Sequence, residues 1–193
     1  ASMVALHSGV GQVVDVNLLT TVFQLMGPVI SLYKLSGELQ PRLGSGLPYS
    51  VPRGVYQCSD EKWVGVSASS DSVAARVMEV LGVGGDDRFS TFAGRMANRE
   101  LLEQLMIDWC AARTRDEVVA TLAAAEAAVG PVFDMADIAT DEHYAARQMI
   151  PIVGSTPMQG LIAQLSKTPG VLGWEGRPLD ADREDILKRG WKQ

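Results

Sequence analysis

Two cysteines and two histidines are the side chains of this 193-residue sequence best suited to act as nucleophiles, bases or soft metal ligands. Cys58 with a distant histidine would supply a nucleophile and its base. Its place at the end of a predicted strand equally suits a small apolar side chain. His7 and His143 lack HxxxH spacing, and Cys58 and Cys110 form no CxxC pair. We therefore expect no metal site and no disulfide framework.

A second candidate is the tripeptide Gly44-Ser45-Gly46. Its backbone N–H groups could bind an anion, although a loop of this composition equally serves as a connector. The sequence contains no GxSxG, P-loop, Rossmann or HExxH motif. That excludes only the enzyme classes that depend on those motifs.

The first 53 residues are expected to form a strand, a long helix and a linker. Three valines in residues 13–16 predict the strand. Residues 18–33 are apolar most of the way round and predict a helix that Gly27-Pro28 kinks or breaks. Three glycines and three prolines in residues 36–53 mark the linker. Other parts of the protein must cover so apolar a helix.

Residues 48–150 are expected to form a compact α+β unit, followed by an irregular tail. Helix N-caps are predicted at Ser70-Asp71, at Asn98 and at Thr114, whose spacing to Glu117 is that of a capping box. The other predicted elements are strands at 54–58 and 63–68, an extended segment at 130–133, and helices at 141–147 and 182–188.

The charge balance argues against a nucleic-acid partner, because 17 basic and 23 acidic residues give a net charge of −6. The most apolar stretch, residues 16–35, carries six polar or charged side chains and is a poor membrane span. The first residues do not show the pattern expected of a secretion signal, and the few cysteines suit a reducing compartment. We expect a cytoplasmic protein with no membrane partner.

Several short motifs, in matching order, resemble the family III (CaiB/BaiF-type) CoA-transferases. They are residues 9–19 (GVGQVVDVNLL), 48–49 with 54–64 (PY and GVYQCSDEKWV), 87–91 (DRFST) with Arg95 and 98–100 (NRE), 130–134 (GPVFD), 141–147 (DEHYAAR) and 166–170 (SKTPG). Each motif alone is weak, but their common order over nearly the whole chain is specific.

The resemblance implies an enzyme that moves coenzyme A between an acyl-CoA and a free carboxylate. It implies an α/β fold in which a Rossmann-like large domain carries an inserted small α+β domain, and two subunits interlock as a homodimer. Residues 1–45 and the tail 151–193 would belong to the large domain, and residues 46–150 would form the small one. Coenzyme A and acyl-CoA would be substrates, with no permanently bound cofactor.

In the family an aspartate attacks the thioester, giving a mixed anhydride and then an aspartyl-CoA thioester. This aspartate is expected upstream of the GVGQ motif, so no catalytic residue is expected in this chain. Asp15 matches a strand position and not the nucleophile. We expect a truncated C-terminal portion, inactive alone, whose partner is the missing half or a second chain.

The family's active-site loop matches the stretch that contains Gly44, Ser45, Gly46 and Tyr49. We expect these residues to face the active site, where backbone N–H groups would stabilise an oxyanion; a hinge between domains is the alternative. Two other functions stay open. One is a 2-methylacyl-CoA racemase-like isomerase, although this chain has Ser70 where those enzymes carry a glutamate. The other is a non-catalytic half-protein that acts as an assembly module.

Overall fold

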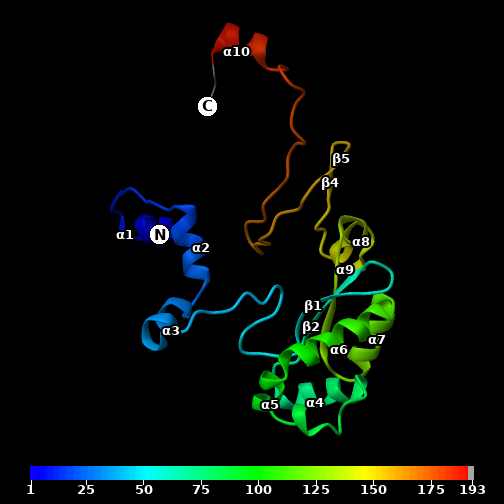
Figure 1. The fold of residues 1–193 in the computed structure, drawn as a ribbon. Coiled ribbons are helices and arrows are strands. Elements are labelled where there is room, and N and C mark those ends of the chain that lie inside the picture. The colour runs from blue at the N-terminus through cyan, green and yellow to red at the C-terminus, as the bar shows by residue number, and fades with distance from the viewer. Residues whose placement is uncertain (191–193) are drawn as a thin grey trace. The chain divides into compact units, whose positions relative to one another are not determined.

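The computed structural model describes residues 1–190 (Figure 1). The chain folds into two compact units, residues 1–130 and 131–193. The division into 1–45, 46–150 and 151–193 stays a prediction, and the last three residues of the predicted tail lie outside the described ones. The two units are described separately.

Three helices open the first unit: α1 (Ser2–Ser8), α2 (Leu18–Leu25) and α3 (Val29–Ser36). The predicted break at Gly27-Pro28 is confirmed, because α2 and α3 are separate helices bent by 70°. Gly27 takes the left-handed conformation (φ 61°), and Pro28 cannot donate the backbone hydrogen bond that would continue α2.

The predicted strand at residues 13–16 is wrong, since this segment is irregular and Val13 is 93% exposed. A strand needs a neighbour to receive its backbone hydrogen bonds, and no described strand lies beside this segment. Helix α1 was not predicted.

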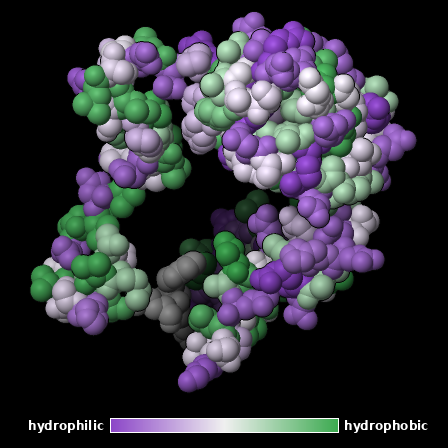
Figure 2. Space-filling model, turned by 90° about the horizontal axis from the view of Figure 1, so that it is seen from below, coloured by the Kyte–Doolittle hydropathy of each residue, from purple (hydrophilic) through white to green (hydrophobic). Residues whose placement is uncertain are grey.

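Helices α2 and α3 contain no buried residue among the described ones. Figure 2 shows hydrophobic residues at the surface of this helical segment. No single helix of residues 1–190 has the length and hydropathy to cross a membrane, although the bent α2–α3 pair passes that test when both helices are counted together.

The chain forms a three-stranded sheet in the order β1-β2-β3, with β1 and β2 in the first unit. The predicted hairpin is confirmed: β1 (Arg53–Gln57) and β2 (Trp63–Ser67) pair antiparallel, with Arg53 opposite Ser67. Strand β3 (Ala128–Val132) overlaps the predicted extended segment. Side chains alternate between a buried and a more exposed face along β1 and β2.

The buried face of the sheet packs on helices, as Figure 1 shows for α6 and α7. These elements are α4 (Asp71–Val80), the 3₁₀ turn η1 (Asp87–Phe89), α5 (Phe92–Ala97), α6 (Arg99–Ala111) and α7 (Arg115–Ala124). Strand residues Tyr56, Val64 and Val66 form one buried cluster with Leu102 and Leu122. This core is the main hydrophobic stabilisation of the unit.

Two predicted caps are confirmed, because Ser70 accepts a hydrogen bond from the Val73 N–H and Thr114 forms a capping box with Glu117. The Asn98 cap is correct in position but wrong in chemistry. Its side-chain amide donates to the Gly94 carbonyl (2.9 Å), so it closes α5 and does not cap α6. The close succession of α5 and α6 makes that carbonyl available.

The second unit holds α8 (Met135–Thr140), α9 (Glu142–Ala146) and α10 (Arg183–Arg189), with a short antiparallel hairpin of β4 (Ile152–Val153) and β5 (Thr156–Pro157). The predicted helices at 141–147 and 182–188 are confirmed as α9 and α10. Helix α8 and the hairpin were not predicted. Most side chains of this unit are exposed.

Candidate functional site

The segment Leu43–Ser50, called the loop below, makes a tight turn before β1. Gly44 takes a left-handed conformation (φ 60°). The Gly46 N–H donates to the Leu43 carbonyl at 2.9 Å, and a Cβ on Gly46 would lie 3.2 Å from that oxygen. The left-handed conformation favours glycine at position 44, and a side chain at position 46 would crowd the Leu43 carbonyl.

Ser45 ties the loop to the edge of the sheet. Its hydroxyl oxygen accepts a hydrogen bond of 2.9 Å from the Val55 N–H of β1. A Cβ on Gly54 would lie 3.2 Å from this oxygen and 3.3 Å from the Tyr56 hydroxyl, so the absence of a side chain allows the close approach. An edge-strand N–H is thereby satisfied by the loop.

Arg99, the first residue of α6, holds the other end of the loop. Its Nη2 donates to the Leu47 carbonyl at 2.8 Å and to the Ser50 carbonyl at 3.2 Å. Sequence reasoning missed this role, although Arg99 lies in the NRE motif. The loop is thus fixed to a strand at one end and to a helix at the other, which is unlike a free hinge.

The predicted loop residues differ in their availability. Gly44, Ser45 and Tyr49 are exposed, and Tyr49 is 64% exposed. The Gly46 N–H is used inside the turn and is not available to an oxyanion, contrary to expectation. Within residues 1–190, the N–H groups of Gly44 and Ser45 have no hydrogen-bond partner.

Below the loop, Tyr56 is anchored in the core. Its hydroxyl donates to Glu103 Oε2 of α6 at 2.7 Å. Burial, with the nearby Glu103 carboxylate, raises the pKa of Tyr56 far above its ordinary value. Tyr56 therefore stays protonated at neutral pH and joins the helix to the strand.

The cysteines lie in the first unit in apolar surroundings, and the histidines lie on helices. Cys58 and Cys110 are free and buried, and burial raises the pKa of both thiols, that of Cys110 to about 12. His7 is exposed on α1, and His143 lies in α9, where Asp141 caps the helix. Within the described chain no three His, Cys, Asp or Glu residues are grouped to hold a metal ion.

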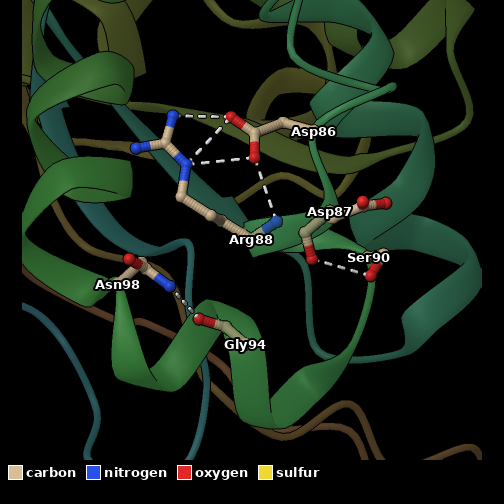
Figure 3. A network of polar contacts seen from close by, with 6 residues as sticks. All are labelled: Asp86, Asp87, Arg88, Ser90, Gly94 and Asn98. Carbon is tan, nitrogen blue, oxygen red and sulfur yellow. Dashed lines mark hydrogen bonds and ion pairs between the residues drawn. The ribbon is translucent and has the colours of Figure 1, made fainter.

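The motif residues between Asp86 and Asn98 support local structure (Figure 3). The Asp86 carboxylate accepts hydrogen bonds from the Arg88 guanidinium, the shortest at 2.6 Å, which lower its pKa. Ser90 donates to the Asp87 carbonyl at 2.9 Å. These contacts shape the turn that leads into α5 and point to no chemistry. Ser70, where a racemase would carry glutamate, is the N-cap of α4.

Comparison with known proteins gives consistent matches. The sequence profile described as CoA-transferase family III matches residues 1–183. The chain is 30% identical, over 96% of its length and 49% of the relative's, to succinyl-CoA–D-citramalate CoA-transferase from Chloroflexus aurantiacus. It is also 30% identical, over 94% of its length and 44% of the relative's, to the alpha subunit of succinyl-CoA–L-malate CoA-transferase from the same organism.

The fold is also shared with a solved structure. A CAIB/BAIF family protein from Brucella suis superposes with a TM-score of 0.77 and 24% identity, covering 97% of this chain and 50% of that one. The chain spans about half the length of the curated relatives it matches. The profile covers nearly every residue of a mixed α/β chain, and the chain belongs to CoA-transferase family III.

Proposed function

We propose that this chain is the C-terminal portion of an enzyme that transfers coenzyme A between an acyl-CoA and a carboxylic acid. The observation that carries the proposal is the family match over residues 1–183. Relatives that are 30% identical and named as CoA-transferases support it. The nucleophilic aspartate belongs to the half of the enzyme outside this sequence.

The proposed reaction proceeds through an aspartyl thioester. The aspartate oxygen attacks the acyl-CoA carbonyl carbon. The C–S bond breaks, CoA thiolate is expelled, and a mixed anhydride of the aspartate and the acyl group forms. The thiolate then attacks the aspartyl carbonyl and releases the donor carboxylate. The acceptor carboxylate then attacks the aspartyl thioester and expels CoA thiolate, which gives a second mixed anhydride. The thiolate attacks the acceptor carbonyl of this anhydride and releases the aspartate, so no oxidant or reductant is needed.

The loop would supply electrostatic stabilisation at these steps. The tetrahedral intermediates carry negative charge on oxygen, which fixed N–H donors stabilise. The unpartnered N–H groups of Gly44 and Ser45 are suited to that role, and the exposed Tyr49 lies on the same loop. The anchors at Ser45 and Arg99 would keep these donors oriented.

The substrate class proposed is a dicarboxylic acid and its CoA thioester. Succinate, malate and citramalate, the acids in the names of two relatives, each carry two carboxylates. The partner proposed is the other half of the enzyme or a second copy, covering the exposed apolar side chains of α2 and α3.

Purification from the native source, followed by intact mass spectrometry and activity measurement, tests the proposal. We expect a second polypeptide that carries the upstream aspartate, and CoA transfer from succinyl-CoA to malate by the complex only. Hydroxylamine should trap the activated aspartate on that polypeptide as a hydroxamate. Full CoA exchange by this chain alone would contradict the proposal.

A further inference from the structure

The exposed face of the sheet contains a hollow of about 420 Å³. Gly65 of β2 and Val129 of β3 lie in its lining, and Arg53, Ser67 and Ser45 bring polar groups to it. A Cβ on Gly65 would find only the Gly130 carbonyl within 4 Å, at 3.9 Å. The missing side chain at Gly65 keeps the hollow open.

Arg53 is the only basic residue in the lining of this hollow. Its Nη1 donates to the Ser69 hydroxyl at 3.3 Å, and in residues 1–190 no carboxylate pairs with it. Arg53 lies directly opposite Ser67, whose hydroxyl is 3.0 Å from that of Ser69. The guanidinium therefore contacts a hydroxyl group at the solvent-exposed surface and, among the described residues, has no carboxylate beside it.

Ser45 adds a hydrogen-bond donor at the edge of the hollow. Its oxygen accepts from the Val55 N–H, so its hydroxyl hydrogen remains available to a ligand. A guanidinium offers planar paired N–H donors, which match the two oxygens of a carboxylate. The hollow is shallow and open to solvent, so it suits a single carboxylate group of a ligand and not a whole enclosed molecule.

We propose that this hollow binds a carboxylate of the acid substrate, with Arg53 as its main partner and Ser45 and Ser67 as hydrogen-bond donors. In the two-carboxylate substrates of the proposed function, on which this inference rests, Arg53 binds the carboxylate that does not react. The site itself accepts any carboxylate, and it favours dicarboxylic acids only in the assembled enzyme, where the other carboxylate of the acid must react elsewhere.

Binding is tested on the full chain by ¹⁵N NMR titration with succinate, butyrate and neutral butyramide. We expect succinate and butyrate to bind with dissociation constants in the millimolar range and to shift the amide signals of Ser45, Gly65 and Ser67. Arg53→Gln should weaken binding at least tenfold, and Arg53→Lys less, because the charge remains while the paired donors are lost.

Arg42→Gln is the matched control, because it removes the same charge from an exposed position in the linker; it should change binding less than twofold. Equal binding of butyramide, or unchanged succinate binding by Arg53→Gln, would overturn the proposal. Circular dichroism of each variant separates loss of binding from loss of fold.

Kinetics of the assembled enzyme separate this inference from the proposed function. With an acyl donor that has no second carboxylate, Arg53→Gln should raise KM for a dicarboxylic acceptor at least tenfold and leave KM for the donor nearly unchanged. If transfer occurs and the acceptor KM does not move, the Arg53 site is wrong and the proposed function stands. If the chain binds succinate through Arg53 but the complex transfers no CoA, the proposed function is wrong and the site stands.

Discussion

At the scale of single residues, Arg99 fixes the loop most directly. One guanidinium nitrogen donates to two backbone carbonyls, those of Leu47 and Ser50. Hydrogen bonds from a charged donor contribute more than neutral ones, and a carbonyl that loses its partner near the core is costly. The orientation of Gly44 and Ser45 therefore depends on a residue of α6 more than 50 positions away in sequence.

Replacing Arg99 should loosen the loop. We expect Arg99→Ala to lower the free energy of unfolding by about 1–2 kcal/mol and to speed amide hydrogen exchange at Ser50, whose N–H donates to the Leu47 carbonyl. Arg99→Lys should have a smaller effect, because the lysine ammonium is still a charged donor. Arg88→Ala is the control, since Arg88 pairs with Asp86 at the surface. Equal exchange rates in Arg99→Ala and the parent would show that the loop does not need this anchor.

The Cys110 thiol gives a prediction for alkaline pH. Burial raises its pKa from 9.0 to about 12 in the folded chain. Between these pH values the unfolded chain loses a proton that the folded chain keeps. The contribution of this thiol to the free energy of unfolding is therefore fully present below about pH 9 and is lost as the pH rises. We expect a loss of roughly 1 kcal/mol at pH 10 after allowance for solvent screening. Urea unfolding at pH 8 and pH 10 measures it.

Cys110→Ala is the control for this titration, and its stability should fall less over the same pH interval. In the parent protein, iodoacetamide should modify Cys110 only after unfolding, because the thiolate is the reactive form. Rapid modification of the folded chain at pH 8 would contradict the assigned burial.

At the scale of elements, helix α7 is capped at both ends by different means. Thr114 and Glu117 form the capping box at its N-terminus. At the C-terminus Arg76 of α4 donates to the carbonyls of Ala125 and Glu126 at 2.7 and 2.8 Å. Both caps satisfy backbone groups that the helix itself leaves unpaired.

Removing the two caps of α7 should have additive effects, because about 15 Å separates the ends of a ten-residue helix. We expect Thr114→Ala and Arg76→Ala each to lower the free energy of unfolding by about 1 kcal/mol, and the double variant by the sum. Thr121→Ala, an exposed change in the same helix, should cost little. Urea unfolding of the four variants measures this, and a clearly smaller loss in the double variant would contradict independence.

The same helix shows which contacts a sequence reveals. The capping box was predictable because both partners lie within four residues, whereas the Arg76 contact joins residues 49 and 50 positions apart.

The β1–β2 hairpin was predicted nearly to the residue, and the pairing of its two strands places Arg53 opposite Ser67. The Arg99 anchor depends on how α6 packs on β1, which local patterns do not determine. At residues 13–16 the valines favoured a strand, but a strand also needs a neighbour.

At the scale of the whole molecule, the apolar surface of α2 and α3 is the main unexplained feature of the first unit. Leu18, Leu19 and Leu25 of α2 are each more than 80% exposed. Exposed apolar areas of this extent favour association, because their burial removes hydrocarbon from water. The compact part of the unit has its own buried cluster and needs no residue of α2.

We therefore expect Leu19→Gln with Leu25→Gln to abolish association of this chain with its proposed partner while leaving its own core intact. Association is measured by co-purification and by light scattering after gel filtration, and the core by the urea midpoint. Ile107→Gln, a change from an apolar to a polar side chain at a 46% exposed position of α6 in the predicted small domain, is the control and should leave association unchanged. If the double variant still binds its partner, the contact lies elsewhere. If it also unfolds at lower urea, α2 contributes to the core, contrary to the observed exposure of its side chains.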